Sequence, residues 1–375
     1  MKKDWEIISM RIVSVVGARP QFIKAASVSR ALRKYHKEIL VHTGQHYDAE
    51  LSDIFFEELN IPKPDYNLEI GSDTHARQTG RMMIAIEPVL IAEKPDVVLV
   101  YGDTNSTLAA ALTAEKLHIP VAHVEAGPRM FNKSMPEEIN RILTDHVSDL
   151  LFAPTQTAVD NLKNEGIREG VYLTGDVMLD GFLYYSEIAG KNSAALSRLG
   201  LKKGEYLLAT FHRVRNTDIE QNLRNIVDAF TGIKSKIVFP LHPRTKKQLN
   251  KYGLYDKLKN APNMILTDPV GYFDSIMLTR NASMVLTDSG GLQREAYFAG
   301  VYCITLDETT GWPETVEDGW NMLVGSDRDK IVDLVVYHCP PGKQRAVFGD
   351  GKAAEKITEI ITAEAGRCRS QYGQE

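Results

Sequence analysis

The residues with the clearest chemical potential are Asp288-Ser289-Gly290-Gly291, which follow the apolar run 282–287 and precede a helical pattern that carries Glu295. A glycine-rich turn from a strand into a helix presents free backbone N–H groups and the positive end of the helix dipole, and both bind phosphate. Glu295 shares a helix face with Gly291, so its carboxylate could reach a sugar hydroxyl beside that phosphate. The pattern indicates a nucleotide-sugar site. A capping Ser289 followed by a tight glycine turn is the alternative.

Cationic residues follow the first predicted strand, 12–16. The segment Gly17-Ala18-Arg19-Pro20 opens a helix that carries Lys24. Both cations could extend over the edge of the sheet toward an anion. Ordinary charges at a solvated helix start would give the same pattern, so these two residues alone do not decide between the readings.

Carboxylates follow the next strands. Asp103 follows the strand Val97–Tyr101 after Gly102, and Glu125 comes directly after Val121–Val124. A helix cap would explain Asp103. It explains Glu125 less well, because a carboxylate that continues a buried strand is costly unless it has a partner or a task. Glu137 stands in Pro136-Glu137-Glu138, which is typical of a helix start as well as of a functional segment.

Histidines and arginines follow two strands of the second half. His212-Arg213 succeed the strand 206–210, and His242-Pro243-Arg244 succeed the strand 237–241. One histidine at a strand end is more often structural than catalytic. Two such ends on the sheet that also carries the Ser-Gly-Gly turn favour an anion-binding cleft.

Short β-branched runs alternate with longer amphipathic stretches, which predicts α/β architecture with parallel sheets. Two such series predict two doubly wound, Rossmann-like domains that face a cleft. We expect an N-terminal domain over residues 1–184 that carries the carboxylates and a C-terminal domain over 185–352 that binds the nucleotide. A last helix within 353–375 would cross back to the first domain.

The composition of the 375-residue chain is that of a globular protein, with 43% hydrophobic and 25% charged residues. A net charge of −5 argues against a nucleic-acid binder but permits a small anionic ligand. Three widely spaced cysteines indicate neither a disulfide framework nor a zinc site, so a reducing cytoplasm is the expected setting. The apolar runs are strand-sized, and we predict neither a secretion signal nor a membrane span.

Taken together, the motifs resemble the non-hydrolysing UDP-N-acetylglucosamine 2-epimerases from about residue 10 to 363. The resemblance implies the glycosyltransferase-B architecture, a homodimer, UDP in the interdomain cleft, and no cofactor or metal. The segments 17–24 and 135–141 look most similar to the branch that acts on UDP-2,3-diacetamido-2,3-dideoxyglucuronic acid.

The resemblance also implies roles for single residues. Asp103, Glu125 and Glu137 form the acid/base set, and His212 lies beside the departing diphosphate. Arg19, Lys24, Ser289 and Gly290 stabilise the charge that develops on UDP, while Glu295 holds the ribose. The substrate-binding set is completed by Arg141, Arg213, His242 and Gly291.

Several residues depart from the family pattern: Pro128, Met130, Arg215, Gly311 and Asp48. Arg215 stands where an acid is usual, which reverses the local charge. Asp48 replaces a glutamine found in members activated by their own substrate, so we expect weak activation or none. These changes leave three alternatives open: a hydrolysing epimerase that releases UDP and free sugar, a retaining glycosyltransferase, and an inactive nucleotide-sugar sensor.

Overall fold

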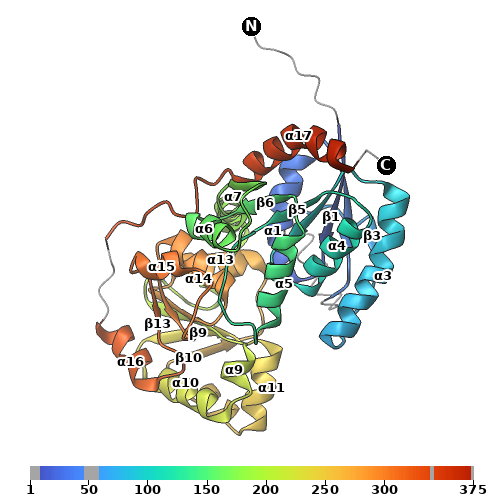
Figure 1. Ribbon diagram of the computed structural model, residues 1–375. Helices are drawn as coiled ribbons and strands as arrows, with labels where there is room; N and C mark the ends of the chain where they lie inside the picture. Colours follow the sequence, from blue (N-terminus) through green and yellow to red (C-terminus); the bar gives the residue numbers. More distant parts are fainter. Residues whose placement is uncertain (1–8, 46–58, 338–341, 373–375) are drawn as a thin grey trace. The chain divides into compact units, whose positions relative to one another are not determined.

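The computed structural model of the protein describes residues 9–45, 59–337 and 342–372 (Figure 1). Asp48 therefore lies outside the described residues. The chain divides into two compact units, and the division falls inside the helix α7 (Val177–Asn192). Unit 1 comprises Met1–Leu183 together with Ala346–Glu375, and unit 2 comprises Tyr184–Arg345.

The described part of unit 1 is built on a parallel sheet of seven strands in the order β3-β2-β1-β4-β5-β6-β7. The order reverses between β1 and β4, which is where open α/β sheets bind their ligands. The strands are β1 (Arg11–Val16), β2 (Lys37–His42), β3 (Tyr66–Asn67), β4 (Val97–Tyr101), β5 (Val121–Val124), β6 (Leu150–Ala153) and β7 (Val171–Leu173).

Helices alternate with these strands along the chain of unit 1. They are α1 (Arg19–Leu32), α3 (His75–Glu93), α4 (Asn105–Lys116), α5 (Pro136–His146), α6 (Gln156–Asn164) and α17 (Ala353–Tyr372). The strands β1, β4 and β5 are almost wholly buried, as expected for apolar strands covered on both faces. α17 packs against α1, and its first backbone N–H groups donate to the Asp180 carboxylate of α7.

Unit 2 repeats this topology with a parallel sheet of six strands among its described residues, in the order β10-β9-β8-β11-β12-β13. The reversal lies between β8 and β11. The strands are β8 (Tyr206–Thr210), β9 (Lys236–Pro240), β10 (Met264–Thr267), β11 (Met284–Thr287), β12 (Tyr302–Thr305) and β13 (Asn321–Leu323). The helices are α8 (Ala195–Arg198), α9 (Val214–Thr217), α10 (Glu220–Gly232), α11 (Pro243–Lys251), α12 (Tyr255–Lys259), α13 (Tyr272–Asn281), α14 (Gly290–Ala299), α15 (Pro313–Glu317) and α16 (Arg328–Tyr337).

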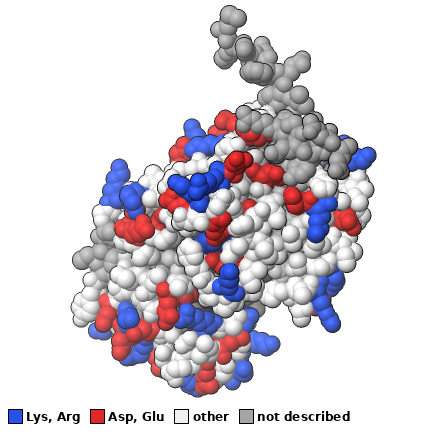
Figure 2. All heavy atoms as spheres, viewed as in Figure 1, with Lys and Arg blue, Asp and Glu red and all other residues white. Residues whose placement is uncertain are grey.

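The predicted fold class, two doubly wound Rossmann-like domains, is confirmed by these two sheets. The cleft between the domains stays a prediction. Acidic and basic side chains are interspersed over the face drawn in Figure 2. Among the described residues, no helix has the length and apolarity needed to cross a bilayer.

Candidate active site

Lys24 and Glu125 form an ion pair in unit 1. Lys24 Nζ lies 2.7 Å from Glu125 Oε1, and the two side chains are only 5% and 9% exposed. Lys24 belongs to α1, and Glu125 directly follows β5. Gly102, at the end of β4, makes room for the pair: a Cβ at Gly102 would lie 2.7 Å from Lys24 Nζ, and its φ of +62° also favours glycine. The carboxylate at this strand end therefore has the partner that its burial requires.

The backbone of Glu125 is itself unusual. Its φ is +72°, in the left-handed region that residues with a side chain rarely adopt. Such strain persists where the surrounding structure fixes it, and it gathers at functional sites. Gly127, two residues on, has a φ of +90° and a neighbouring carbonyl oxygen, Ala158 O, only 2.3 Å from where a Cβ would stand. The turn after β5 is thus held in one conformation.

Asp103 follows β4 and pairs with Arg141 of α5. Arg141 also binds Glu138, with Nη1 2.7 Å from Oε2. Burial alone would lower the pKa of the Arg141 guanidinium, but the carboxylates of Asp103 and Glu138 outweigh it and hold that pKa above its ordinary value. Asn140 of α5 donates to the Asp103 carbonyl at 3.0 Å, so α5 fixes both the main chain and the side chain of Asp103.

Glu137 and Glu138 have different environments at the start of α5. Glu137 is exposed. Glu138 is buried, and its carboxylate accepts backbone N–H groups from Met130 (3.0 Å) and Phe131 (2.7 Å) as well as the Arg141 guanidinium. Glu138 therefore holds the loop before α5 in place, whereas the Glu137 side chain is exposed to solvent.

In unit 2, the buried carboxylate of Asp288 ties the ends of β8 and β11 together. It accepts the backbone N–H groups of His212 (3.1 Å) and Arg213 (2.9 Å) and the amide of Asn216 (2.9 Å). The His212 ring is partly exposed and stacks on His242, with ring centroids 5.0 Å apart. His242 in turn caps α11, where its Nδ1 accepts the Arg244 N–H. The two predicted histidines are therefore neighbours.

The start of α14 is built around Gly290. Ser289 is the N-cap position, but its side chain makes no capping hydrogen bond, so the capping alternative does not explain this serine. A Cβ at Gly290 would lie 3.1 Å from Trp312 Nε1. The Arg294 guanidinium lies over the Trp312 ring at 3.8 Å, a cation–π contact between α14 and the residue before α15. Glu295 is buried on the same helix.

The arginines after β8 are paired with acids. Arg213 Nη1 and Arg215 Nη1 both lie 3.2 Å from the Asp307 carboxylate, and Arg215 also binds Glu308. These acids raise the pKa of Arg215, with Glu308 the largest influence. The charge that Arg215 introduces is therefore matched within unit 2.

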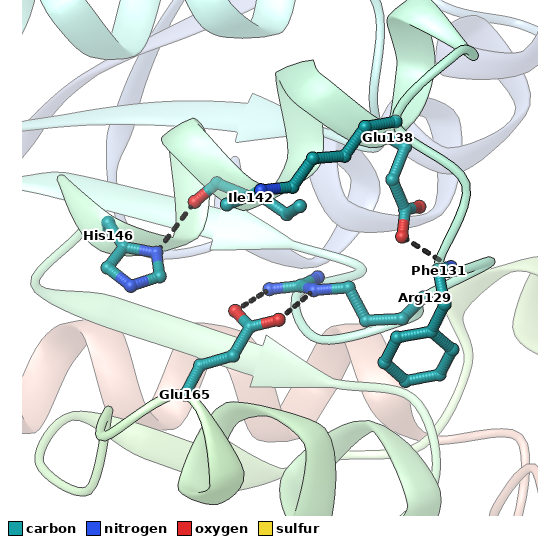
Figure 3. Close-up of a pocket in the computed structure, with 7 residues that line it drawn as sticks. Arg129, Phe131, Glu138, Ile142, His146 and Glu165 are labelled. Atoms are coloured by element: carbon teal, nitrogen blue, oxygen red, sulfur yellow. Dashed lines mark hydrogen bonds and ion pairs between the residues drawn. The ribbon is translucent and has the colours of Figure 1, made fainter.

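A surface pocket of about 550 Å³ lies elsewhere in unit 1 (Figure 3). The Arg129 guanidinium and the Glu165 carboxylate, joined by two hydrogen bonds of 2.7 Å, form part of its wall. The other lining residues are Phe131, Lys133, Glu138, Ile142 and His146. The pocket includes Glu138 of the predicted motif but none of the three predicted acid/base residues.

The structure thus gathers Lys24, Asp103, Glu125 and Arg141 around the ends of β4 and β5 in unit 1, with Glu137 at the start of α5. In unit 2 it gathers His212, Arg213, His242 and the α14 start with Ser289, Gly290, Gly291 and Glu295. Arg19 begins α1, but its side chain lies outside the described part.

Asp288 and Glu138 stood within the sequence motifs but had no predicted role, and the buried pair of His123 and Asp145 was not predicted. A usable signal existed for His123, because an ionisable residue in the middle of the apolar strand β5 needs a partner.

Comparisons with known proteins identify the family. The family model described as UDP-N-acetylglucosamine 2-epimerase matches residues 30–362. A UDP-N-acetylglucosamine 2-epimerase homolog of Methanococcus maripaludis is 54% identical over 354 residues, which cover 94% of this chain and 99% of the relative. The UDP-2,3-diacetamido-2,3-dideoxy-D-glucuronate 2-epimerase of Pseudomonas aeruginosa is 48% identical, with the same coverage.

Among solved structures, the UDP-GlcNAc 2-epimerase of Methanocaldococcus jannaschii in complex with UDP-GlcNAc and UDP matches with a TM-score of 0.89 and 46% identity. The match covers 94% of this chain and all of that one. This similarity extends over both units, and the chain belongs to the UDP-N-acetylglucosamine 2-epimerase family.

Proposed function

We propose that this protein is an isomerase that inverts C2 of a UDP-linked 2-acetamido sugar by elimination and re-addition of UDP. The observation that carries the proposal is the pair of carboxylates at neighbouring strand ends, Asp103 after β4 and Glu125 after β5, each held by a cation. Paired acids of this kind suit proton transfer on a sugar ring.

Acid/base residues alone cannot remove the C2 proton of such a sugar. The C2 proton is not acidic, because no carbonyl adjoins that carbon. Its removal must therefore be coupled to the departure of UDP from C1, which leaves a glycal-like intermediate. Inversion then requires proton transfer on both faces of that intermediate, which we assign to Asp103, Glu125 and Glu137. Lys24 and Arg141 place a cation beside the carboxylates of Glu125 and Asp103, respectively.

The groups of unit 2 hold UDP while it is detached. We assign the diphosphate to the backbone N–H groups of Ser289, Gly290 and Gly291 at the start of α14, together with His212, Arg213 and His242. Arg19 and Lys24 add cationic charge, and Glu295 binds the ribose hydroxyls. Asp288 supports this set because its carboxylate accepts the backbone N–H groups of His212 and Arg213.

Two substrates fit the family, UDP-N-acetylglucosamine and UDP-2,3-diacetamido-2,3-dideoxyglucuronic acid. The relative named for the diacetamido sugar is 48% identical, and relatives named for UDP-N-acetylglucosamine are 54% and 46% identical, so identity does not separate the two substrates. Each sugar is therefore incubated with the protein in D2O. We expect deuterium at C2 together with the manno epimer for one of them. Binding without exchange would contradict epimerisation and indicate a sensor, and release of UDP with free sugar would indicate the hydrolysing reaction.

The role of Asp103 is tested by Asp103→Asn. We expect a loss of C2 exchange of about 100-fold or more, because an amide cannot take up a proton. The dissociation constant for UDP, measured by titration calorimetry, is expected to stay within about threefold because UDP is held in unit 2. A large loss of UDP affinity would mean that Asp103 binds the nucleotide instead.

We also propose a homodimer in a reducing cytoplasm. The apolar side chains of Ile84 and Ile91 support the dimer: they are exposed and lie two turns apart on α3. The thiol of Cys303, which is free and buried, fits a reducing compartment.

A further inference from the structure

His123 is a buried ionisable residue to which the proposed reaction assigns no role. It lies within β5, and its side chain has no exposed surface. Both ring nitrogens have a partner at 2.7 Å: Nδ1 faces Asp145 Oδ1 of α5, and Nε2 faces the carbonyl oxygen of Gly102 after β4. The ring therefore bridges three elements of unit 1.

The chemistry of these two partners determines where the protons are. A carbonyl oxygen can only accept a hydrogen bond, so Nε2 must carry a proton. The Arg129 guanidinium, whose Nη1 lies 2.7 Å from Asp145 Oδ2, gives the buried Asp145 carboxylate a cationic partner that does not depend on His123. An ionised Asp145 also only accepts, so Nδ1 must carry a proton as well. With both nitrogens donating, the ring is an imidazolium.

The same pair holds both turns that carry the proposed acids. Through Nε2 it fixes the Gly102 carbonyl, immediately before Asp103. Through Asp145 Oδ2, which accepts the Gly127 N–H at 3.1 Å, it fixes the turn immediately after Glu125. One buried ion pair thus sets the backbone of both strand ends.

Charges of alternating sign continue away from the ring. Arg129 Nη1 lies 2.7 Å from Asp145 Oδ2, and the same guanidinium binds Glu165 near the end of α6. The charged and titratable groups on the elements around His123 are Glu137, Glu138, Arg141, Asp145 and His146 on α5, Arg129 after β5, Glu165 after α6, Lys24 on α1, and Asp103 and Glu125 themselves.

We propose that His123 is a positioning residue that donates from both ring nitrogens and, with Asp145, holds Asp103 and Glu125 in place for proton transfer. The inference rests on the proposed epimerase reaction for its kinetic consequences but not for the protonation state. The ring does not touch the substrate, and it acts through the Gly102 carbonyl and the Gly127 N–H.

The protonation state is measured directly on the unmodified protein by 15N NMR of the histidine rings at pH 7. We expect one ring whose two nitrogens are both protonated, and we expect Asp145→Asn to convert that ring to a neutral form. In that variant the amide can donate to Nδ1 and still accept from Gly127 and Arg129, so the contacts remain while the charge is lost. A neutral His123 ring in the unmodified protein at pH 7 would overturn the inference.

Kinetics separate positioning from simple stability. For Asp145→Asn we expect kcat to fall by about 10- to 100-fold, with KM within about threefold. Glu165→Gln, at the far end of the charge series, serves as the control and should keep kcat within about twofold. If Asp145→Asn lowers the melting temperature but leaves kcat unchanged, His123 is structural only. An unmodified protein that does not epimerise would contradict the proposed function, whereas the NMR result would stand.

Discussion

The ion pair of Lys24 and Glu125 gives a prediction about stability at the residue scale. Lys24→Met should destabilise unit 1 by about 3–5 kcal/mol, because it leaves the Glu125 carboxylate buried without its cation. Urea unfolding followed by circular dichroism measures the loss. Lys34→Met is the matched control: Lys34 follows α1 and is exposed, so its replacement should cost less than about 0.5 kcal/mol.

A double variant tests the cause of that loss. Lys24→Met combined with Glu125→Gln removes both charges, and we expect it to recover most of the stability lost in Lys24→Met. If the double variant is as unstable as the single one, the loss comes from packing of the lysine side chain and the buried charge is not responsible.

The thiol of Cys303 gives a pH-dependent prediction. Burial raises its pKa from 9.0 to about 12. At pH 9 only about 0.1% of this thiol is then ionised, so alkylation in a Cys339→Ser/Cys368→Ser background should be slow and should quicken about tenfold per pH unit up to pH 10. Because the unfolded thiol ionises near pH 9, this group favours unfolding as the pH rises from 9 toward 12. A labelling rate that levels off near pH 9 would show an accessible thiol.

Sequence reasoning reached some residues of the candidate site but missed others for a physical reason. Glu125 was identified because a carboxylate after a buried strand needs a partner, and the structure supplies Lys24. That partner lies 101 positions away, so neither its identity nor the pair's geometry could be read from local sequence. Asp288 was quoted as part of a phosphate motif, yet its contacts with His212 and Arg213 depend on how β8 pairs with β11.

At the scale of elements, the turn after β5 depends on Gly127. Gly127→Ala should destabilise the protein by about 3 kcal/mol or more, since it adds both a positive-φ penalty and a clash with Ala158 O. Gly166→Ala isolates the first term, because Gly166 has a φ of +89° and no atom within 4 Å of its virtual Cβ. That control should cost only about 1–2 kcal/mol in the same urea titration. Equal losses of stability in the two variants would mean that the backbone of the turn shifts and relieves the clash with Ala158 O.

Element boundaries followed from the sequence wherever the apolar pattern was strong. The strands β4, β5 and β8 were predicted with the bounds that the structure has. The short strands β3, β7 and β13 were missed, because two or three partly polar residues give no periodic signal. The sequence shows no strand pattern for some residues after Tyr184. The structure has the second half of the helix α7 there, so this part of the chain is regular secondary structure.

At the scale of the whole molecule, the α3 surface gives a prediction about assembly. Ile84→Asp with Ile91→Asp should convert the proposed dimer to a monomer, because two buried carboxylates at an interface would lack partners. Light scattering after size-exclusion chromatography measures the mass. The matched control, Ile219→Asp with Val336→Asp, places the same charges on exposed apolar positions of unit 2 and should leave the dimer intact. If the α3 variant keeps the mass of a dimer and the unmodified protein is also dimeric, the subunits associate through another surface.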